Sequence, residues 1–374
     1  MQTKPQQLTE QRVPPEIRCA QDYESLAAGY IDAPTLAYIA GGSGSDRTVR
    51  ANRTAFDRHA VLPRVLHDVS DGNTRVRLPG AELPHPILLA PVALQHLVHA
   101  DGECATARAA DVTQSCLIAS SLSSVTLEDI ARHSTGPKWF QLYFQPVRAA
   151  THELLRRAEA AGYDAIVVTL DAALQLPSQT ALAAGFRMPA AIRPANFTAT
   201  TKPEAAFSNL FQAYMHSAVC AEDLSWLLHN TTLPVWVKGV LHVDDARTMR
   251  ALGVAGIIVS NHGGRSLDGA PASLAMLPGV RAAVGANYPV LFDGGVRSGA
   301  DVFKAIALGA DAVLIGRLQV YALAVAGALG VAHLVKLLSE ELELHMASSG
   351  CCSIAAVRGT ALHSSGDNGS ASAC

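Results

Sequence analysis

Eight short, almost entirely apolar runs recur along the chain from about residue 84, and they alternate with stretches of helical character. Runs of this kind are typical of parallel strands that are buried on both faces. They span residues 87–91, 116–120, 138–143, 165–170, 234–238, 256–260, 289–293 and 312–315. Eight alternations of strand and helix predict an α/β fold, a (β/α)8 TIM barrel.

The stretches between the strands carry ordinary helix start and stop signals. Asp101 and Thr126 are candidate N-caps, and Gly162 is a candidate stop. We predict helices at residues 103–114, 127–133, 151–161, 242–252, 274–284 and 300–308. The uncharged stretch 318–335 is rich in Ala and Gly, and we predict a helix buried against the barrel rather than a membrane span.

Three regions fall outside this alternation. Residues 1–83 are predicted to form an N-terminal helical extension with an amphipathic helix near 23–38, packed on a barrel of residues 84–350. Residues 172–232 separate the fourth and fifth strands, and an insertion of this length is expected to form an extended loop or lid. The tail 351–374 is rich in small polar residues and is expected to be flexible.

Composition narrows the possible partners. The 374 residues include 29 Lys and Arg against 32 Asp and Glu, only 16% of residues are charged, and no basic block occurs, so a nucleic-acid partner is not expected. The odd number of cysteines, seven, without C-x-x-C spacing argues against a disulfide framework and a zinc site. The polar N-terminus lacks a secretory signal, and the 14 histidines show no metal-ligand spacing. We therefore expect a cytoplasmic protein with no metal and no membrane partner.

Polar residues and glycines gather where the predicted strands end, the edge of a barrel at which chemistry is found. Gly294, Gly295 and Gly316 would expose backbone N–H groups to an anion, and Arg297 and Arg317 would add positive charge. These residues favour a phosphate site over the alternative, tight turns with solvated arginines.

Lys238 closes an apolar strand, where a buried ammonium needs an anionic partner. Three interpretations stay open: a Schiff-base amine, a fixed cation beside a cofactor that becomes negative on reduction, or a lysine that extends to solvent.

His262 and Arg265 share one glycine-containing loop, and Asp171 ends the fourth strand. An imidazole is a usual proton acceptor, a carboxylate can orient it, and a guanidinium binds a substrate carboxylate. The alternative for His262 is an ordinary histidine of the core or a loop.

The run Ser260-Asn261-His262-Gly263-Gly264-Arg265-Ser266-Leu267-Asp268-Gly269-Ala270-Pro271 resembles the signature of the FMN-dependent 2-hydroxy acid oxidase/dehydrogenase family, which includes glycolate oxidase, lactate oxidase and mandelate-oxidising enzymes. The resemblance extends over about residues 23–346 and includes the segments 140–143, 169–171, 237–239 and 293–301.

The resemblance implies the following catalytic roles. His262 takes the hydroxyl proton as the α-hydrogen leaves, formally as hydride, to flavin N5, and Asp171 pairs with His262. Arg265 binds the substrate carboxylate, with Tyr38 and Tyr143 bonding carboxylate or hydroxyl. Lys238 stabilises the reduced flavin near N1 and O2.

The resemblance also implies an FMN site. Ser120, Gln141 and Thr169 would bond the isoalloxazine, Ala90, Pro91 and Val92 would lie along it, and Asp293 would contact the ribityl chain. The phosphate would be bound by Gly295, Arg297, Gly316 and Arg317, with Gly294 and Ser260 in the same site.

Two departures from the family pattern bear on the substrate. Ser178 stands where the family has a second arginine facing the substrate carboxylate, and Arg187 or Arg193 could compensate. Leu122 stands where glycolate-type enzymes carry tryptophan, which indicates a wider, apolar pocket. Ser178 and Leu122 therefore join the predicted substrate-binding set.

We expect FMN-dependent oxidation of an (S)-2-hydroxy acid to the 2-oxo acid, with O2 as electron acceptor and H2O2 as product. Leu122 and the apolar segment 190–215 favour a bulky or aromatic, mandelate-like substrate. The alternatives are a non-standard substrate, another electron acceptor, or a non-catalytic flavin- or phosphate-binding barrel. The resemblance suggests a homotetramer.

Overall fold

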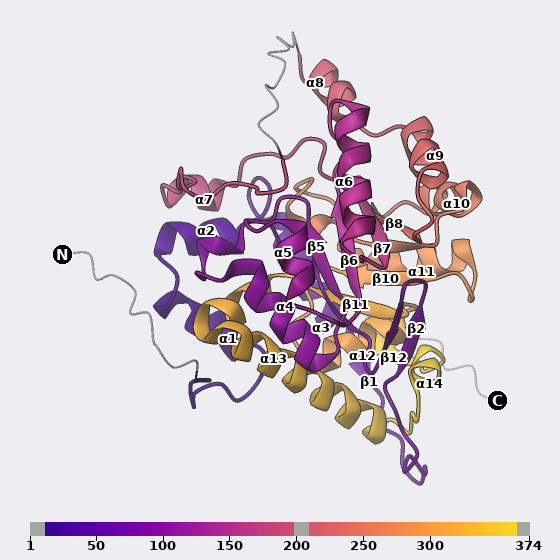
Figure 1. Ribbon diagram of the computed structural model, residues 1–374. Coiled ribbons are helices and arrows are strands. Elements are labelled where there is room, and N and C mark those ends of the chain that lie inside the picture. Colours follow the sequence, from indigo (N-terminus) through magenta and orange to yellow (C-terminus); the bar gives the residue numbers. More distant parts are fainter. Residues whose placement is uncertain (1–11, 198–208, 365–374) are drawn as a thin grey trace.

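Eight parallel strands close into a barrel, which confirms the predicted TIM fold (Figure 1). The computed structural model describes residues 12–197 and 209–364. Each apolar run contains one barrel strand, and β8 continues two residues beyond its run. The strands are β4 (Ile87–Leu89), β5 (Leu117–Ser120), β6 (Lys138–Leu142), β7 (Ala165–Thr169), β8 (Val235–Val240), β9 (Gly256–Val259), β10 (Val290–Asp293) and β11 (Ala312–Ile315).

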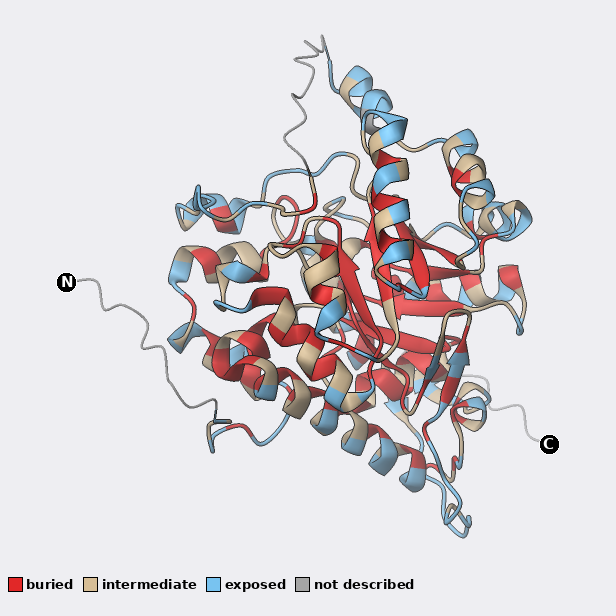
Figure 2. Cartoon of the chain, in the orientation of Figure 1, coloured by how far each residue is buried: buried red, intermediate tan, exposed pale blue. Residues whose placement is uncertain are grey.

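The barrel strands are almost fully buried, because helices cover their outer face and side chains fill the interior (Figure 2). Trp139 and Trp236 stack there with ring centroids 4.9 Å apart. Their indole N–H groups donate to the carbonyls of Gly80 and Pro79, next to the hairpin of β2 (Val76–Leu78) and β3 (Ala81–Leu83). This interior is a packed core, which leaves the C-terminal ends of the strands for chemistry.

The predicted helices form between the strands, with ends within three residues of those expected. They are α4 (Gly102–Thr113), α5 (Leu127–Arg132), α6 (Arg148–Ala160), α10 (Val243–Leu252), α11 (Ser273–Val284) and α12 (Gly299–Ala307). Thr126 caps α5 as predicted, accepting from the amide of Asp129. The Asp101 side chain makes no cap bond to α4.

The uncharged stretch 318–335 lies within α13 (Arg317–Ser348), which packs against α4 and α12. Within the described residues, α13 is the one helix long and apolar enough to cross a membrane. In this fold 72% of its most apolar window is buried, as expected for a core helix. Its path bends at Gly327, whose φ of 57° is left-handed.

The N-terminal extension differs from the single amphipathic helix expected at residues 23–38. It contains α1 (Asp22–Leu26), the short 3₁₀ helix η1 (Ala27–Gly29), α2 (Ala33–Ala40) and α3 (Arg47–Asp57), followed by β1 (His59–Val61). The expected helix is interrupted because Asp32 starts a new one: its carboxylate accepts from the amide of Thr35, and its backbone is extended.

The described part of the tail, residues 351–364, contains a helix and a strand, whereas the composition predicts a flexible segment there. Ser353 caps α14 (Ile354–Arg358), which buries Ile354 and Val357. The next strand, β12 (Leu362–Ser364), pairs antiparallel with β1. Buried apolar side chains and strand pairing therefore tie down a segment whose composition alone suggests disorder. Residues 365–374 lie outside the described residues.

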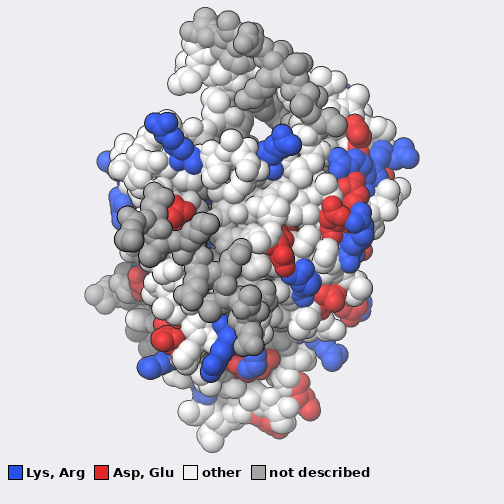
Figure 3. Space-filling model, turned by 60° about the vertical axis from the view of Figure 1, so that its left-hand side comes forward, with Lys and Arg blue, Asp and Glu red and all other residues white. Residues whose placement is uncertain are grey.

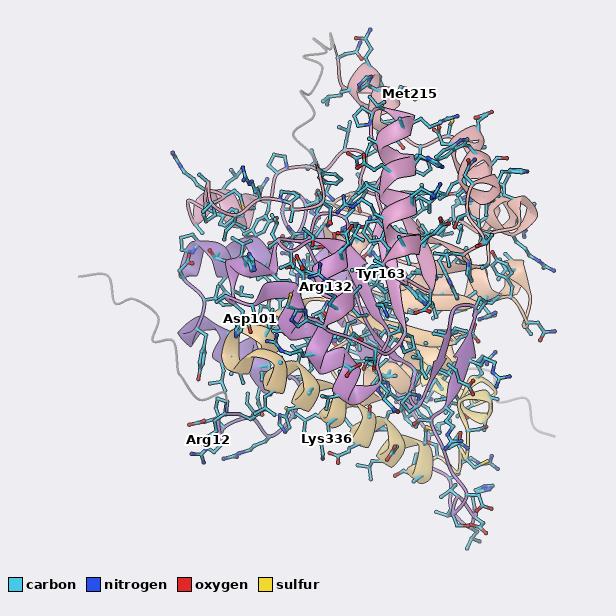
Figure 4. The ribbon with its side chains drawn as sticks, viewed as in Figure 1. Arg12, Asp101, Arg132, Tyr163, Met215 and Lys336 are labelled. Atoms are coloured by element: carbon cyan, nitrogen blue, oxygen red, sulfur yellow. The ribbon has the colours of Figure 1, made fainter. Side chains whose placement is uncertain are left out.

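The described part of the insertion between β7 and β8, which leaves out residues 198–208, carries three short helices. They are α7 (Gln179–Ala183), α8 (Leu210–Ser217) and α9 (Ala221–His229). The helix α8 projects from the body of the molecule, with Met215 on its outer part (Figure 4). Leu210, Phe211 and Met215 are exposed on it.

Charged side chains of both signs are interspersed on the surface in Figure 3.

Candidate active site

A cavity of about 620 Å³ lies at the C-terminal ends of the barrel strands. Its wall includes most of the residues singled out in the sequence, drawn from the N-terminal extension through the start of α13. These are Tyr38, Ala90, Pro91, Val92, Ser120, Leu122, Tyr143, Lys238, His262, Arg265, Asp293, Gly294, Gly295, Arg297, Gly316 and Arg317. The fold thus gathers the expected cofactor and substrate residues around one space.

His262 and Asp171 form a hydrogen-bonded pair, with His262 Nδ1 2.8 Å from Asp171 Oδ1. Burial alone would raise the pKa of Asp171, but His262 and Lys238 outweigh it, so the pKa lies below its ordinary value. Asp171 therefore remains a carboxylate that fixes the imidazole and stabilises its protonated form. His262 itself lines the cavity, and the pairing through Nδ1 leaves Nε2 for proton transfer.

The backbone of His262 is left-handed, with φ of 59°, and Gly263 and Gly264 follow in the same region. A left-handed conformation is costly for a side chain other than glycine and is common at functional sites. The surrounding structure holds this loop: the side-chain amides of Asn261 and Asn52 form two reciprocal hydrogen bonds of 2.8 and 2.9 Å. The contact made by Asn52, on α3, is not evident from the sequence, because its partner Asn261 lies more than two hundred positions away.

Lys238 is buried and ion-paired, with Nζ 2.9 Å from both Asp293 Oδ2 and Ser260 Oγ. Burial by itself would lower the pKa of Lys238, but Asp293 and Asp171 raise it above its ordinary value. A Schiff-base amine would have to be neutral, so the geometry favours the fixed cation. The solvent-extended lysine is excluded by an exposure of 3%.

Ser260 was expected among the FMN contacts, but it lies behind the cavity wall. Its hydroxyl donates to Asp293 at 2.8 Å and accepts from the backbone amide of His262 at 2.9 Å. Ser260 therefore joins the lysine–aspartate pair to the histidine loop.

Two buried polar groups support the fit of FMN, which the resemblance implies. Gln141 Oε1 accepts from the Ser120 hydroxyl at 3.2 Å, while Gln141 Nε2 has no partner among the described residues. Thr169 Oγ1 is likewise buried without a described partner. Unpartnered buried polar groups are costly, and a flavin ring offers both donors and acceptors that would satisfy them.

Gly316 leaves room for a ligand at the expected phosphate site. A Cβ placed at Gly316 would meet nothing closer than Ala90, at 4.0 Å. Gly294 and Gly295 have φ of 127° and 88°, which allow the backbone to turn at the cavity wall.

The two expected phosphate-binding arginines differ in their partners. Arg297 forms a bidentate pair with Glu24 of α1, at 2.6 and 3.1 Å. Arg317 instead donates to the carbonyls of Ile39, Gly41 and Gly263. Burial, together with neighbouring arginines, lowers the pKa of Arg317 to about 10. A bound phosphate would neutralise its charge. The residues present therefore fit FMN.

Arg265 and Tyr38 lie together at the expected substrate side. Arg265 Nη1 donates to the carbonyls of Tyr38 and Gly41 at 2.9 and 3.0 Å, and its Cζ lies 5.0 Å from the centre of the Tyr38 ring. Tyr143 also faces the cavity, and burial raises its pKa to about 12, so its hydroxyl remains a donor.

Ser178 is not on the cavity wall, so the structure does not bring it together with the other expected substrate-binding residues, and its place in that set stays a prediction. Its side chain accepts from the amide of Ala181 at 3.2 Å and caps α7. A Cβ at Gly41 would come within 2.5 Å of Ser178 Oγ, which shows how closely the cap approaches α2. Arg187 and Arg193 are exposed and are not on the cavity wall, so the structure does not bring either side chain into the site, and their compensation for Ser178 stays a prediction.

The apolar segment 190–215 contributes only in part. Phe197 lines the cavity, but Phe211 and Tyr214 are exposed on α8, and Phe207 lies outside the described residues. The wall also includes residues that the sequence did not indicate, among them Gln95, Gln145 and the segment 172–175. Gln145 and the segment 172–175 lie in irregular loops, and Gln95 begins a 3₁₀ helix of three residues, so no hydrophobic period marks which of these side chains point inward.

The chain matches a known family model and well-covered relatives. The model for FMN-dependent dehydrogenases matches residues 27–364. An L-lactate oxidase of Alicycliphilus denitrificans is 63% identical over 345 residues, which cover 91% of this chain and 94% of that protein. A crystal structure of mandelate oxidase with (S)-2-phenylpropionate superposes with a TM-score of 0.85 at 40% identity, covering 92% of this chain and 98% of that one. A mandelate oxidase variant with a C4a-OH-FMN adduct gives a TM-score of 0.84, also at 40% identity, over 91% of this chain and 98% of that one.

Proposed function

The chain belongs to the FMN-dependent dehydrogenase family, and on that premise we propose that it oxidises a short (S)-2-hydroxy acid, L-lactate in the first place, to the 2-oxo acid. Membership makes it an FMN flavoprotein and an oxidoreductase that acts on CH–OH groups. In the proposed reaction O2 is the electron acceptor: the hydroxy acid loses two electrons and two protons, and O2 becomes H2O2.

The observation that carries the proposal is the His262–Asp171 pair at the wall of a cavity that fits FMN. His262 Nε2 accepts the hydroxyl proton of the substrate, and the Asp171 carboxylate stabilises the imidazolium that results. A binding module would need no such proton acceptor. FMN, when bound, supplies the acceptor for the two electrons that leave with the α-hydrogen.

The substrate carboxylate is assigned to Arg265, with the hydroxyls of Tyr38 and Tyr143 as hydrogen-bond donors. A guanidinium and two hydroxyls are complementary to a carboxylate beside a hydroxyl-bearing carbon. The buried Lys238 remains cationic through its pair with Asp293 and favours negative charge on the cofactor side of the cavity.

The choice of L-lactate rests on the 63% identity to an L-lactate oxidase along 94% of that protein. Leu122 and Phe197 on the wall favour a second candidate, a bulky or aromatic acid of the mandelate type. A further alternative keeps the substrate but transfers the electrons to an acceptor other than O2.

A substrate panel tests the proposal. Purified FMN-bound protein is mixed with L-lactate, glycolate, (S)-mandelate and D-lactate, and O2 consumption, H2O2 and the 2-oxo acid are measured together. We expect the highest kcat/KM with L-lactate and one H2O2 per 2-oxo acid formed. Higher kcat/KM with (S)-mandelate would favour the second candidate. Flavin reduction without O2 consumption would identify another acceptor, and no reduction by any acid would overturn the proposal.

A further inference from the structure

We propose that Phe186 is a positioning residue for the substrate carboxylate, acting through Tyr38 and Arg265; this inference rests on the proposed function. Phe186 follows α7 in the insertion after β7 and is not on the cavity wall. Phe186 therefore affects the site indirectly, through its contact with the ring of Tyr38.

The Phe186 and Tyr38 rings are stacked, with centroids 4.3 Å apart and planes inclined by 10°. A parallel ring at this distance covers one face of Tyr38, so the Arg265 guanidinium, 5.0 Å from the ring centre, lies over the other. Aromatic stacking and a cation over a ring both favour a fixed orientation. The tyrosine is thereby held between the insertion and the histidine loop.

Arg265 is linked to Tyr38 through the backbone as well, because its Nη1 donates to the Tyr38 carbonyl at 2.9 Å. A shift of the Tyr38 ring therefore changes both a neutral donor and the guanidinium of the expected carboxylate site. Both side chains line the cavity, whereas Phe186 only supports them.

The helix before Phe186 is itself fixed against the N-terminal extension. The amide of Gln179 donates to the Gly44 carbonyl at 2.9 Å, and the Thr180 hydroxyl bonds Asp46. Ser178 caps this helix beside Gly41, and the amide of Phe186 donates to the Ala181 carbonyl at 3.0 Å. Phe186 thus follows directly after a helix that is hydrogen-bonded to the N-terminal extension.

The absence of a second arginine gives this arrangement its importance. Ser178 caps a helix, and Arg187 and Arg193 are exposed and not on the cavity wall, so Arg265 is the described guanidinium that lies beside Tyr38 at this side of the cavity. The placement of Tyr38 therefore carries a larger share of carboxylate binding.

Steady-state kinetics of three single variants test the proposal first, with the acid that wild-type enzyme oxidises best. Phe186→Leu keeps an apolar side chain but removes the stack, and we expect KM to rise about 5-fold with kcat within about 2-fold and FMN content unchanged. Phe186→Tyr restores an aromatic face and is expected to have a KM near that of wild type. Leu182→Ala, at an exposed position on α7, is the matched control and should leave KM unchanged.

The decisive comparison places Phe186→Leu in a Tyr38→Phe background, which retains the ring but lacks the hydroxyl. Because the ring still lies beside Arg265 in this background, Phe186→Leu should still raise KM, but by less than in the presence of the Tyr38 hydroxyl, since the part of the effect that depends on that hydroxyl is gone. An equal rise in both backgrounds, or a rise in KM with Leu182→Ala as large as with Phe186→Leu, would overturn the inference. If none of the 2-hydroxy acids reduces the flavin of the wild-type enzyme, the proposed function itself would be overturned instead.

Discussion

Asp171 Oδ1 lies 2.8 Å from His262 Nδ1, and this contact joins the ends of β7 and β9, which are separated by β8 in the barrel. The Asp171 carboxylate is also close enough to Lys238 for the two charges to affect each other's pKa. The base, its carboxylate and the buried cation therefore form one electrostatic unit.

Asp171→Asn tests the role of the carboxylate. An amide cannot stabilise an imidazolium as a carboxylate does, so we expect the rate of anaerobic flavin reduction to fall about 100-fold or more. FMN content should be retained, since Asp171 is not on the cavity wall. Stopped-flow absorbance measures the rate, and a rate within about 2-fold of wild type would contradict the assigned role.

Lys238→Met tests the buried pair, because the substitution leaves the Asp293 carboxylate without its partner. We expect the free energy of unfolding to fall by about 3 kcal/mol, and most of it to return in the double variant Lys238→Met/Asp293→Asn. FMN affinity should be lower than that of wild type in both the single and the double variant, since the lysine cation is absent from each. Denaturant unfolding and FMN titration measure the two quantities; equal stability of the single and double variants would exclude the pair as the cause.

Tyr143 gives a pH prediction. Burial raises its pKa from 10.0 to about 12, so the neutral phenol persists and donates at every pH below that value. The alkaline limb of the kcat/KM profile should therefore be the same in wild type and Tyr143→Phe, with the variant about 10-fold lower throughout. Loss of the alkaline limb in the variant would show that Tyr143 itself titrates there.

Ser178→Ala tests the helix cap. Removal of an N-cap costs about 1 kcal/mol, so the amide of Ala181 should exchange with solvent about 5-fold faster, while Ser178→Asp should exchange at nearly the wild-type rate. Ser178→Arg also loses the cap, and residue 178 does not line the cavity. We therefore expect the KM of this variant for L-lactate to be no lower than that of wild type. A lower KM in the arginine variant would mean that residue 178 reaches the substrate.

Leu122→Trp tests the width of the pocket. The larger ring fills space at the cavity wall, so kcat/KM for (S)-mandelate should fall about 10-fold more than kcat/KM for L-lactate. Competing both acids against the same enzyme measures the ratio directly. An unchanged ratio would place the substrate side chain away from Leu122.

The sequence was sufficient for the barrel, because each buried strand is a continuous apolar run such as 165–170 or 312–315. It also located His262, Asp171 and Lys238, since polar residues at strand ends meet on one edge of a parallel barrel. The ordered segment 351–364 was missed, because strand pairing of β12 with β1 depends on residues some three hundred positions away.

Long-range contacts are the part of the site that the sequence does not show. Nothing local indicates the bidentate pair of Arg297 with Glu24, or that the Ser178 side chain caps a helix. Phe186 was missed for the same reason, since its stacking partner Tyr38 lies in another part of the chain. Composition and spacing indicate the chemistry that a residue is capable of, whereas these contacts depend on how loops far apart in the sequence pack against each other.

Anaerobic mixing of FMN-bound protein with L-lactate tests whether His262 is the base of a 2-hydroxy acid oxidation, with wild type and His262→Ala compared at matched FMN content. We expect wild type to lose its yellow flavin absorbance and to form one 2-oxo acid per flavin, while His262→Ala keeps FMN but stays oxidised. Wild-type flavin that stays oxidised with every 2-hydroxy acid, or a His262→Ala variant that bleaches at the wild-type rate, would contradict this role of His262.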